Sequence, residues 1–197
     1  MKKIKIDLDN IKEKDIQLII NYYRNGKVIA HPSDTIYGLG CLVSSSEAIN
    51  KIYKIKKRKN NPLLVLVDSY DMLKNYAFFN KKQEKYLRSV WKKGERPTTV
   101  VLKKKKLLSN LITNNLDSIA VRIPQNIFLI RILKAVKEAI VSTSLNISGK
   151  KNLENLEKID SYFEILPDLL VDAGIVSGFS SRLIDIRDID NIKIVRD

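Results

Sequence analysis

The stretch that decides the fold runs from Ala30 to Val67: it opens with AHPSDTIYGLG, continues through KIKKRK at Lys54–Lys59 and closes with NPLLVLV at Asn61–Val67. Its last five residues form an uninterrupted apolar run, which is typical of a strand buried on both faces. The opening residues predict a strand that enters a loop of hydroxyls and glycines, and the middle predicts a helix with a basic end. This order of elements brings phosphate-binding groups to the end of a sheet.

The rest of the chain alternates similar elements. Apolar residues at helical spacing predict helices over residues 16–23, 71–76, 82–91 and 126–136, a partly helical segment over 153–166, and a helix that begins with the capping box of Ser44 and Glu47. Pro32–Gly40 is expected to be loop. Strands are expected at Lys3–Leu8, Val28–Ala30, Leu63–Val67, Thr98–Leu102, Ser118–Ile123, Ala139–Ser142, Leu169–Asp172, Arg182–Ile186 and Ile192–Val195. The interleaving predicts a single α/β domain over residues 1–197, with one twisted sheet of mixed parallel and antiparallel strands.

The composition limits the class of protein. A formal charge of +14 favours a polyanionic partner or phosphate-bearing substrate, although a genome biased toward Lys, Ile and Asn gives the same total. The Lys103–Lys106 run is open to two interpretations, a solvated loop or an RNA contact. No apolar run approaches the ~18 residues of a membrane span, and the N-terminus lacks the apolar core of a signal peptide, so the expected location is the cytoplasm.

Common catalytic motifs are missing from the sequence. Cys41 is the only cysteine and His31 the only histidine, so a disulfide and a cysteine-based zinc site are excluded. We interpret both residues as structural. Neither a P-loop nor a G-x-G-x-x-G motif occurs, and Gly38-Leu39-Gly40 alone does not support a dinucleotide site.

Hydroxyl, amide and basic side chains instead gather at the ends of the expected strands. They are Ser33, Thr35 and Tyr37; Lys56 and Arg58; Arg122; Ser142, Thr143, Ser144 and Asn146; and Ser181 and Arg196. The basic residues at the end of the helix also have a structural explanation, because cations stabilise a helix C-terminus. Together these groups favour a pocket for an anionic, phosphate-bearing small molecule.

Arg122 is the sharpest anomaly in this set. It interrupts an apolar strand, SIAVRIP, where an arginine is either exposed at a sheet edge or buried beside an anion. A guanidinium matches a carboxylate or phosphate with two parallel hydrogen bonds.

Five stretches, in order, resemble the YrdC/TsaC family of threonylcarbamoyl-AMP synthases. HPSDTIYGLG is similar to the family's P-T-[DE]-T-x-Y-G-L, KKRKNNPLLVLV to its K-x-R segment, RPTTVVL to its P-x-T-x-V-L, SIAVRIP to its A-V-R-x-P, and STSLNISG to its T-S-A-N-x-S-G. SRLIDI with the closing IVRD is a weaker sixth match. The resemblance spans about residues 12–196 and implies a YrdC-like fold around a basic concave face.

The resemblance implies a reaction. L-Threonine, bicarbonate and ATP are joined into threonylcarbamoyl-AMP with release of pyrophosphate, the first step of a tRNA modification next to the anticodon. Mg²⁺ would be bound through the phosphates, with no metal site of the protein's own. Further proteins would transfer the threonylcarbamoyl group, and tRNA is a further candidate partner through the basic surface.

The family match also implies roles for residues. Lys56 and Arg58 would act on the phosphates as the catalytic cations, and the adenylate would be held by Thr143, Ser144, Asn146 and Arg196. The threonine would be held by Arg122 at its carboxylate and by Ser33, Thr35, Tyr37, Ser142 and Ser181. Five residues depart from the family pattern: Ser33, Leu145, the pair Glu95-Arg96, and Arg182 after Ser181.

Two other functions fit the same features. A non-catalytic RNA-binding module would explain the charge, and a carbamoyl-transfer domain would share the fold. The latter occurs in larger chains with cysteine-based zinc modules, which one cysteine does not provide.

Overall fold

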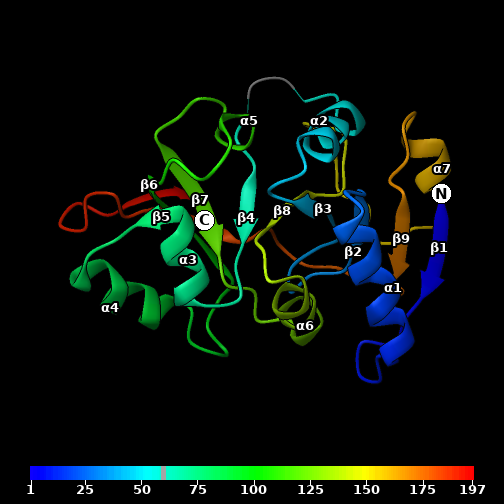
Figure 1. Ribbon diagram of the computed structural model, residues 1–197, viewed down its shortest axis with the longest axis horizontal. Helices are drawn as coiled ribbons and strands as arrows, with labels where there is room; N and C mark the ends of the chain where they lie inside the picture. Colours follow the sequence, from blue (N-terminus) through cyan, green and yellow to red (C-terminus); the bar gives the residue numbers. More distant parts are fainter. Residues whose placement is uncertain (59–60) are drawn as a thin grey trace.

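The computed structural model of the chain describes residues 1–58 and 61–197, in which eleven strands form one sheet with helices on both faces (Figure 1). The strands are β1 (Lys2–Lys5), β2 (Ile29–His31), β3 (Gly38–Leu42), β4 (Leu64–Leu66), β5 (Ala77–Phe78), β6 (Thr98–Lys104), β7 (Ser118–Arg122), β8 (Ile140–Ser144), β9 (Leu169–Asp172), β10 (Arg182–Asp185) and β11 (Lys193–Arg196). The helices are α1 (Glu13–Arg24), α2 (Ser46–Ile55), α3 (Tyr70–Tyr76), α4 (Lys81–Val90), α5 (Asn110–Thr113), α6 (Ile127–Val136) and α7 (Ile159–Tyr162).

The sheet is mixed, as the sequence predicted. Its strands lie in the order β1-β9-β2-β3-β8-β4-β7-β6-β10-β11, with β5 paired to β6 outside this path. The pairs β1/β9, β2/β9, β4/β7 and β6/β10 are parallel, and the remaining pairs are antiparallel. Strands from distant parts of the chain are therefore neighbours at the centre of the sheet.

Alternating residues on the central strands divide the core in two. Val65 and Val141 pack on one face with α2, α3, α4, α5 and α7. Leu66 and Ile140 pack on the other face with α1 and α6. This alternation is the period of two that a pleated strand imposes, and it explains why consecutive residues are apolar at Leu64–Leu66 and at Ile140 and Val141.

The face under α1 and α6 continues past the helices. Leu64 and Ser142 are register partners, two residues along their strands from Leu66 and Ile140, and Ala120 pairs with Leu64. All three line a cavity. One part of this face of the sheet therefore packs against α1 and α6, and the adjoining part forms the floor of the cavity.

The predicted loop Pro32–Gly40 is wrong at its end, because Gly38 and Gly40 belong to β3. A Cβ at Gly40 would lie 2.9 Å from His31 Nε2 and 3.0 Å from the Tyr23 hydroxyl. A Cβ at Gly38 would lie 3.1 Å from Ser142 Oγ. The glycines thus allow close packing of β3 against neighbouring side chains, which the sequence could not distinguish from close approach to a ligand.

The start of α2 is one residue later than predicted. Ser45, not Ser44, is the N-cap, and its Oγ accepts a hydrogen bond from the backbone N–H of Ala48. The N–H of Ser44 instead donates to Glu138 Oε1 at 2.8 Å. The backbone of Ser44 is therefore tied to the residues just before β8, and the capping hydroxyl comes from Ser45.

Several other elements differ from the prediction in their presence or bounds. The sequence missed β5 and α5, which are two and four residues long. Lys103 and Lys104 extend β6, so half of the lysine run is strand. Of the segment 153–166 only Ile159–Tyr162 is helical. The Asn126 cap is confirmed, since its side chain accepts from the backbone N–H of Leu129.

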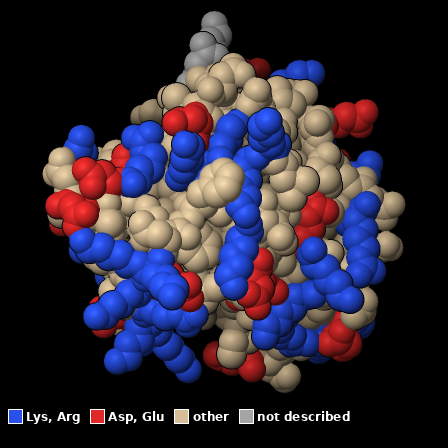
Figure 2. Space-filling model, turned by 60° about the vertical axis from the view of Figure 1, so that its left-hand side comes forward, with Lys and Arg blue, Asp and Glu red and all other residues tan. Residues whose placement is uncertain are grey.

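Basic side chains are widespread on the surface. Figure 2 shows lysines and arginines, interspersed with acids, gathered over the side of the molecule where α4 and β6 lie. Within the described ranges, the chain contains no helix of the length and apolarity needed to span a membrane. The basic concave face stays a prediction.

Candidate active site

The turn from β2 to β3 is organised by the hydroxyl of Ser33. Ser33 Oγ donates to the Ile36 carbonyl at 2.6 Å and accepts from the backbone N–H groups of Thr35 and Ile36. Thr35 Oγ1 lies 2.9 Å from Ser33 Oγ. In this turn a side-chain hydroxyl closes the loop by bonding to the backbone of the residues that follow it. Because the hydroxyl is the group that the turn requires, serine can take the place of threonine here.

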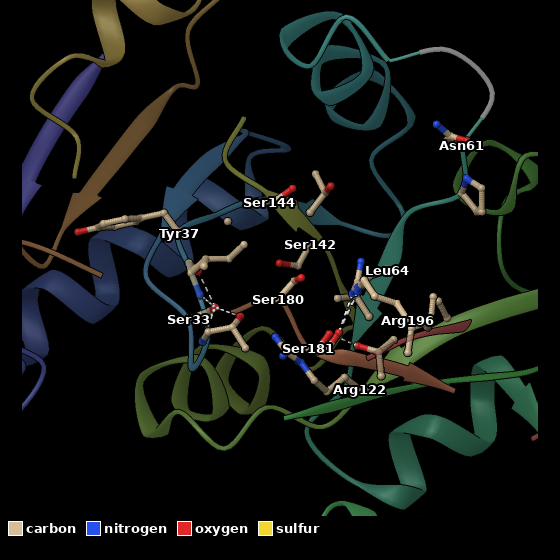
Figure 3. Close-up of a pocket in the computed structure, with 18 of the residues that line it drawn as sticks. Ser33, Tyr37, Asn61, Leu64, Arg122, Ser142, Ser144, Ser180, Ser181 and Arg196 are labelled. Carbon is tan, nitrogen blue, oxygen red and sulfur yellow. Dashed lines mark hydrogen bonds between the residues drawn. The ribbon is translucent and has the colours of Figure 1, made fainter. Parts of the chain in front are cut away.

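The Tyr37 hydroxyl points away from the other predicted hydroxyls, as Figure 3 shows. It accepts from the Ala173 N–H at 2.8 Å and donates to the Gly174 carbonyl at 2.9 Å. Burial raises the pKa of Tyr37 to about 12, so the phenol stays protonated at neutral pH. A Tyr37 contact to threonine stays a prediction, and the hydroxyl already serves to hold residues 173 and 174.

Lys56 caps α2 and reaches into the loop after β8. Its Nζ donates to the carbonyl oxygens of Ser144 (2.5 Å) and Asn146 (2.9 Å) and to Asn146 Oδ1 (2.8 Å), and it lies 3.5 Å from Ser144 Oγ. Burial, with the nearby Arg58 charge, lowers the Lys56 pKa to about 7, whereas these oxygens favour the ammonium. The predicted trio of Lys56, Ser144 and Asn146 is thus one hydrogen-bonded unit.

Arg58 lies at the cavity wall. Its Nη1 donates to Thr143 Oγ1 at 3.2 Å and its Nη2 to the Pro62 carbonyl at 2.8 Å. Both partners are neutral, so the charge of Arg58 is available to an anion. Lys59, which the sequence placed in the same basic cluster, lies outside the described residues, as does Asn60 of the matched stretch.

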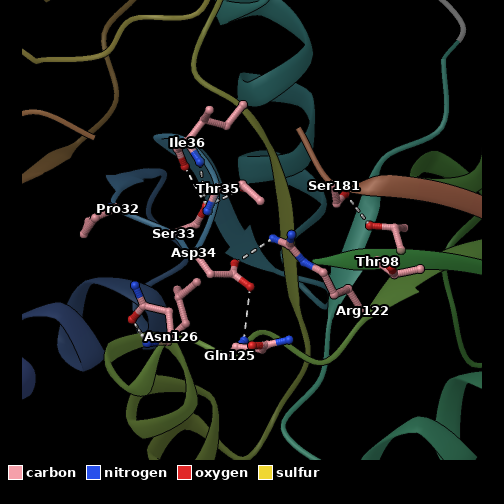
Figure 4. Close-up of polar contacts among 12 residues, drawn as sticks. Pro32, Ser33, Asp34, Thr35, Ile36, Thr98, Arg122, Gln125, Asn126 and Ser181 are labelled. Atoms are coloured by element: carbon pink, nitrogen blue, oxygen red, sulfur yellow. Dashed lines mark hydrogen bonds and ion pairs between the residues drawn. The ribbon is translucent and has the colours of Figure 1, made fainter. Parts of the chain in front are cut away.

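Arg122 is buried beside an anion, so the edge-exposed alternative is wrong. Only 3 % of Arg122 is exposed, and its Nη2 lies 3.1 Å from Asp34 Oδ1 (Figure 4). Its Nε and Nη1 are buried without a hydrogen-bond partner among the described residues. Asp34 Oδ1 forms an ion pair but no hydrogen bond with Arg122 in the described structure, so a ligand that took a two-bond edge of the guanidinium would bind directly beside this carboxylate.

Ser181 and Arg196 join the last hairpin to the same site. Ser181 Oγ lies 2.7 Å from Thr99 Oγ1, and Arg196 donates to the Ser181 carbonyl through Nε (3.1 Å) and Nη2 (2.7 Å). The strands β6, β10 and β11 therefore close one side of the site.

These groups surround one cavity of about 300 Å³. All predicted site residues line it except Lys56 and Asn146, which lie behind Ser144. Figure 3 shows Ser33, Ser142, Ser180 and Arg122 converging on it. Among the described lining residues there are three arginines and no carboxylate, so the cavity is suited to an anion.

Sequence reasoning missed four residues of the site. Asp34 lay inside the quoted motif, but its partner Arg122 is 88 positions away and only the fold joins them. Thr99 and Ser180 line the cavity, and Gln125 donates its N–H to Asp34 Oδ2 at 3.1 Å. For Thr99, Ser180 and Gln125 the available signal was a hydroxyl or amide near a strand end, and this signal is too common to identify a site.

The burial predicted for Cys41 is confirmed, and His31, for which the sequence predicted a structural role, also lies in the core. Both are fully buried. Burial raises the Cys41 pKa to about 12, which keeps it a thiol. In the part of the chain that the structure describes, no three His, Cys, Asp or Glu residues are grouped to hold a metal ion.

The fold and the cavity define an α/β protein with an open, cationic, hydroxyl-lined site for a small anionic ligand. The sequence profile of the family described as "Telomere recombination", which groups Sua5, YciO and YrdC, matches residues 21–197. The chain belongs to this Sua5/YciO/YrdC family, which confirms the resemblance.

Relatives with assigned names extend this result. The chain is 30% identical over 174 residues to the threonylcarbamoyl-AMP synthase of Psychromonas ingrahamii, covering 87% of this chain and 91% of the relative. It is 29% identical over 180 residues to that of Pyrococcus abyssi, covering 90% of this chain and 52% of the relative, so it spans about half of that longer protein. The crystal structure of P. abyssi Sua5 complexed with L-threonine has a TM-score of 0.85 at 28% identity, over 94% of this chain and 54% of that one.

Proposed function

We propose that this chain joins L-threonine, bicarbonate and ATP into threonylcarbamoyl-AMP and releases pyrophosphate. The observation that carries the proposal is the single cavity in which Arg58, Arg122 and Arg196 meet a row of hydroxyls without a lining carboxylate. The names of the relatives favour this synthase over a non-catalytic RNA-binding module or a carbamoyl-transfer domain.

The chemistry requires a protected cationic site. The threonine amine attacks the carbon of CO₂ and loses a proton, or attacks the carbon of bicarbonate with loss of water. Either route gives a carbamate, which is labile in water. A carbamate oxygen then attacks the α-phosphorus of ATP, and the bond from that phosphorus to the pyrophosphate oxygen breaks. Positioning and cations accelerate such a transfer more than covalent catalysis does.

The arginines divide the two substrates between them. Arg58 and Arg196 hydrogen-bond only to neutral groups in the described structure, so we assign them to the phosphates. Arg122 would hold the threonine carboxylate, with Ser33 and Ser142 nearby in the same cavity. Thr35, Tyr37 and Ser181 complete the proposed threonine set.

Lys56 acts in this scheme through the loop it holds. Its ammonium is enclosed by oxygens of Ser144 and Asn146, so it fixes the segment that would carry the adenylate, together with Thr143. A direct contact from Lys56 to the phosphates, as the family resemblance implies, stays a prediction.

The described lining residues do not fit a Mg²⁺ site of their own, because they offer hydroxyls and arginines without a carboxylate. We therefore expect Mg²⁺ to enter with ATP, held by the phosphates. Cytoplasmic location, transfer of the product by further proteins and direct tRNA contact through the basic surface are parts of the same proposal.

The test is pyrophosphate release by the purified chain. We expect release from ATP when L-threonine and bicarbonate are both present, and its loss when either is omitted. Release that is independent of threonine would contradict the proposal, as would salt-sensitive RNA binding without any ATP turnover.

A further inference from the structure

Asp34 and Arg122 form the ion pair with the least exposed partners among the described residues. The exposed fractions of their side chains are 9% and 4%. A buried ion pair is costly to desolvate, and removing one partner strongly destabilises the protein. A contribution to folding stability is therefore a poor explanation for the presence of this pair. It lies at the wall of the cavity, which Arg122 lines.

Asp34 is itself held from behind. Its Oδ2 accepts from the backbone N–H of Gln125 at 3.1 Å (Figure 4). The Gln125 side chain in turn accepts from the Gly94 N–H at 3.1 Å and donates to the Glu95 carbonyl at 2.8 Å. The carboxylate therefore has a fixed direction, and its Oδ1, which has no hydrogen-bond partner among the described residues, is held 3.1 Å from Arg122 Nη2 as an ion pair.

The pair also divides the cavity by charge. At Arg122 the guanidinium and carboxylate cancel, whereas Arg58 and Arg196 keep their full charge because the hydrogen-bond partners described for them are neutral. A phosphate, which is a net anion, is attracted to the uncompensated arginines. An amino acid carries one charge of each sign, so it loses little binding energy beside the neutral pair of Asp34 and Arg122.

We infer that Asp34 is a positioning residue that fixes Arg122 and neutralises it, so that this corner of the cavity takes a zwitterionic amino acid and rejects phosphate. The inference rests on the proposed function. It adds a reason why L-threonine and ATP, which both carry negative groups, do not bind in each other's part of the cavity. Arg122 keeps two buried donors, Nε and Nη1, that lack described partners and are left for a ligand.

Asp34→Asn tests the inference by removing the charge and little of the shape. We expect the Kd for L-threonine, measured by calorimetry, to rise about tenfold or more, and pyrophosphate to begin displacing threonine from this variant. Asp168→Asn is the matched control, because it breaks the ion pair with Lys51 (2.7 Å) outside the cavity and should leave both affinities unchanged. Equal losses of threonine and ATP affinity in Asp34→Asn would indicate a merely structural role and overturn the inference.

The unmodified chain provides a second measurement that does not depend on the folding of a variant. We expect saturating pyrophosphate to leave L-threonine bound. Displacement of threonine by pyrophosphate in the unmodified chain would overturn the inference alone. A chain that binds no threonine at all would instead contradict the proposed function, and the inference with it.

Discussion

Lys56 is 1% exposed, and the oxygens described within hydrogen-bonding distance of its ammonium belong to Ser144 and Asn146. A buried cation of this kind is tolerated only with complete hydrogen bonding. At the scale of single residues, the part of the site around Lys56 is therefore built from polar groups that satisfy one another before any ligand binds, whereas Arg122 Nε and Nη1 have no partner among the described residues.

Lys56→Ala should lower kcat/KM for pyrophosphate release about 100-fold, because the loop at residues 144–146 loses the group that holds it. The KM for ATP should rise more than the KM for threonine. Lys56→Arg should not rescue activity, since a branched guanidinium does not fit where one nitrogen meets four oxygens. The control is Lys85→Ala, which removes an exposed lysine on α4, and unaltered turnover in Lys56→Ala would exclude this role.

His31 predicts a pH dependence of stability. Burial, followed by the nearby Arg122 charge, lowers its pKa from 6.5 to about 4, opposed in part by the Pro32 carbonyl. The unfolded chain therefore binds a proton between pH 6.5 and 4 that the folded chain does not. Stability is complete above about pH 6.5 and falls as the pH drops, by about 2 kcal/mol at pH 5 from this residue.

Urea unfolding at pH 7 and pH 5 measures this effect. The difference between the two free energies of unfolding should shrink by about 2 kcal/mol in His31→Gln. An unchanged difference would show that His31 does not stay neutral in the folded chain.

Among elements, the segment 173–181 between β9 and β10 forms one wall of the cavity. The Tyr37 hydroxyl holds its start, and the Val176 N–H donates to the Glu154 carbonyl at 2.8 Å. Gly178 packs directly on the backbone of Thr35. The segment thereby delivers Ser180 and Ser181 to the cavity.

Gly178→Ala should displace this segment, because its Cβ would lie 2.4 Å from the Thr35 carbonyl oxygen, a backbone atom that cannot move aside easily. We expect a loss of about 1–3 kcal/mol in stability and weaker ATP binding. Ser177→Ala, a change at the preceding exposed position, is the control. Wild-type ATP affinity in Gly178→Ala would show that the segment does not shape the site.

For the whole molecule, the sheet was predictable where its strands carried apolar runs, as at Leu64–Leu66 and at Ile140 and Val141, because burial on both faces leaves a clear pattern. β3 was missed because two glycines in a five-residue strand are also typical of a loop. Strand order was not predictable, since β8 lies between β3 and β4 through pairing that no local pattern specifies.

For the candidate site, the residues were largely predictable from the sequence but their interactions were not. Hydroxyls and arginines at strand ends indicated one cavity, and ten of the residues so chosen do line it. The interactions among them were not predictable, because Asp34–Arg122 and Lys56–Asn146 join residues about 90 positions apart. Those interactions decide which charges remain for a ligand.

The most direct measurement of the account is mass spectrometry of the product formed by the purified chain from ATP, L-threonine and ¹³C-bicarbonate. We predict threonylcarbamoyl-AMP that carries the label, in amounts equal to the pyrophosphate released. Formation of AMP and pyrophosphate without a labelled adduct would contradict the claim that this cavity joins the three substrates.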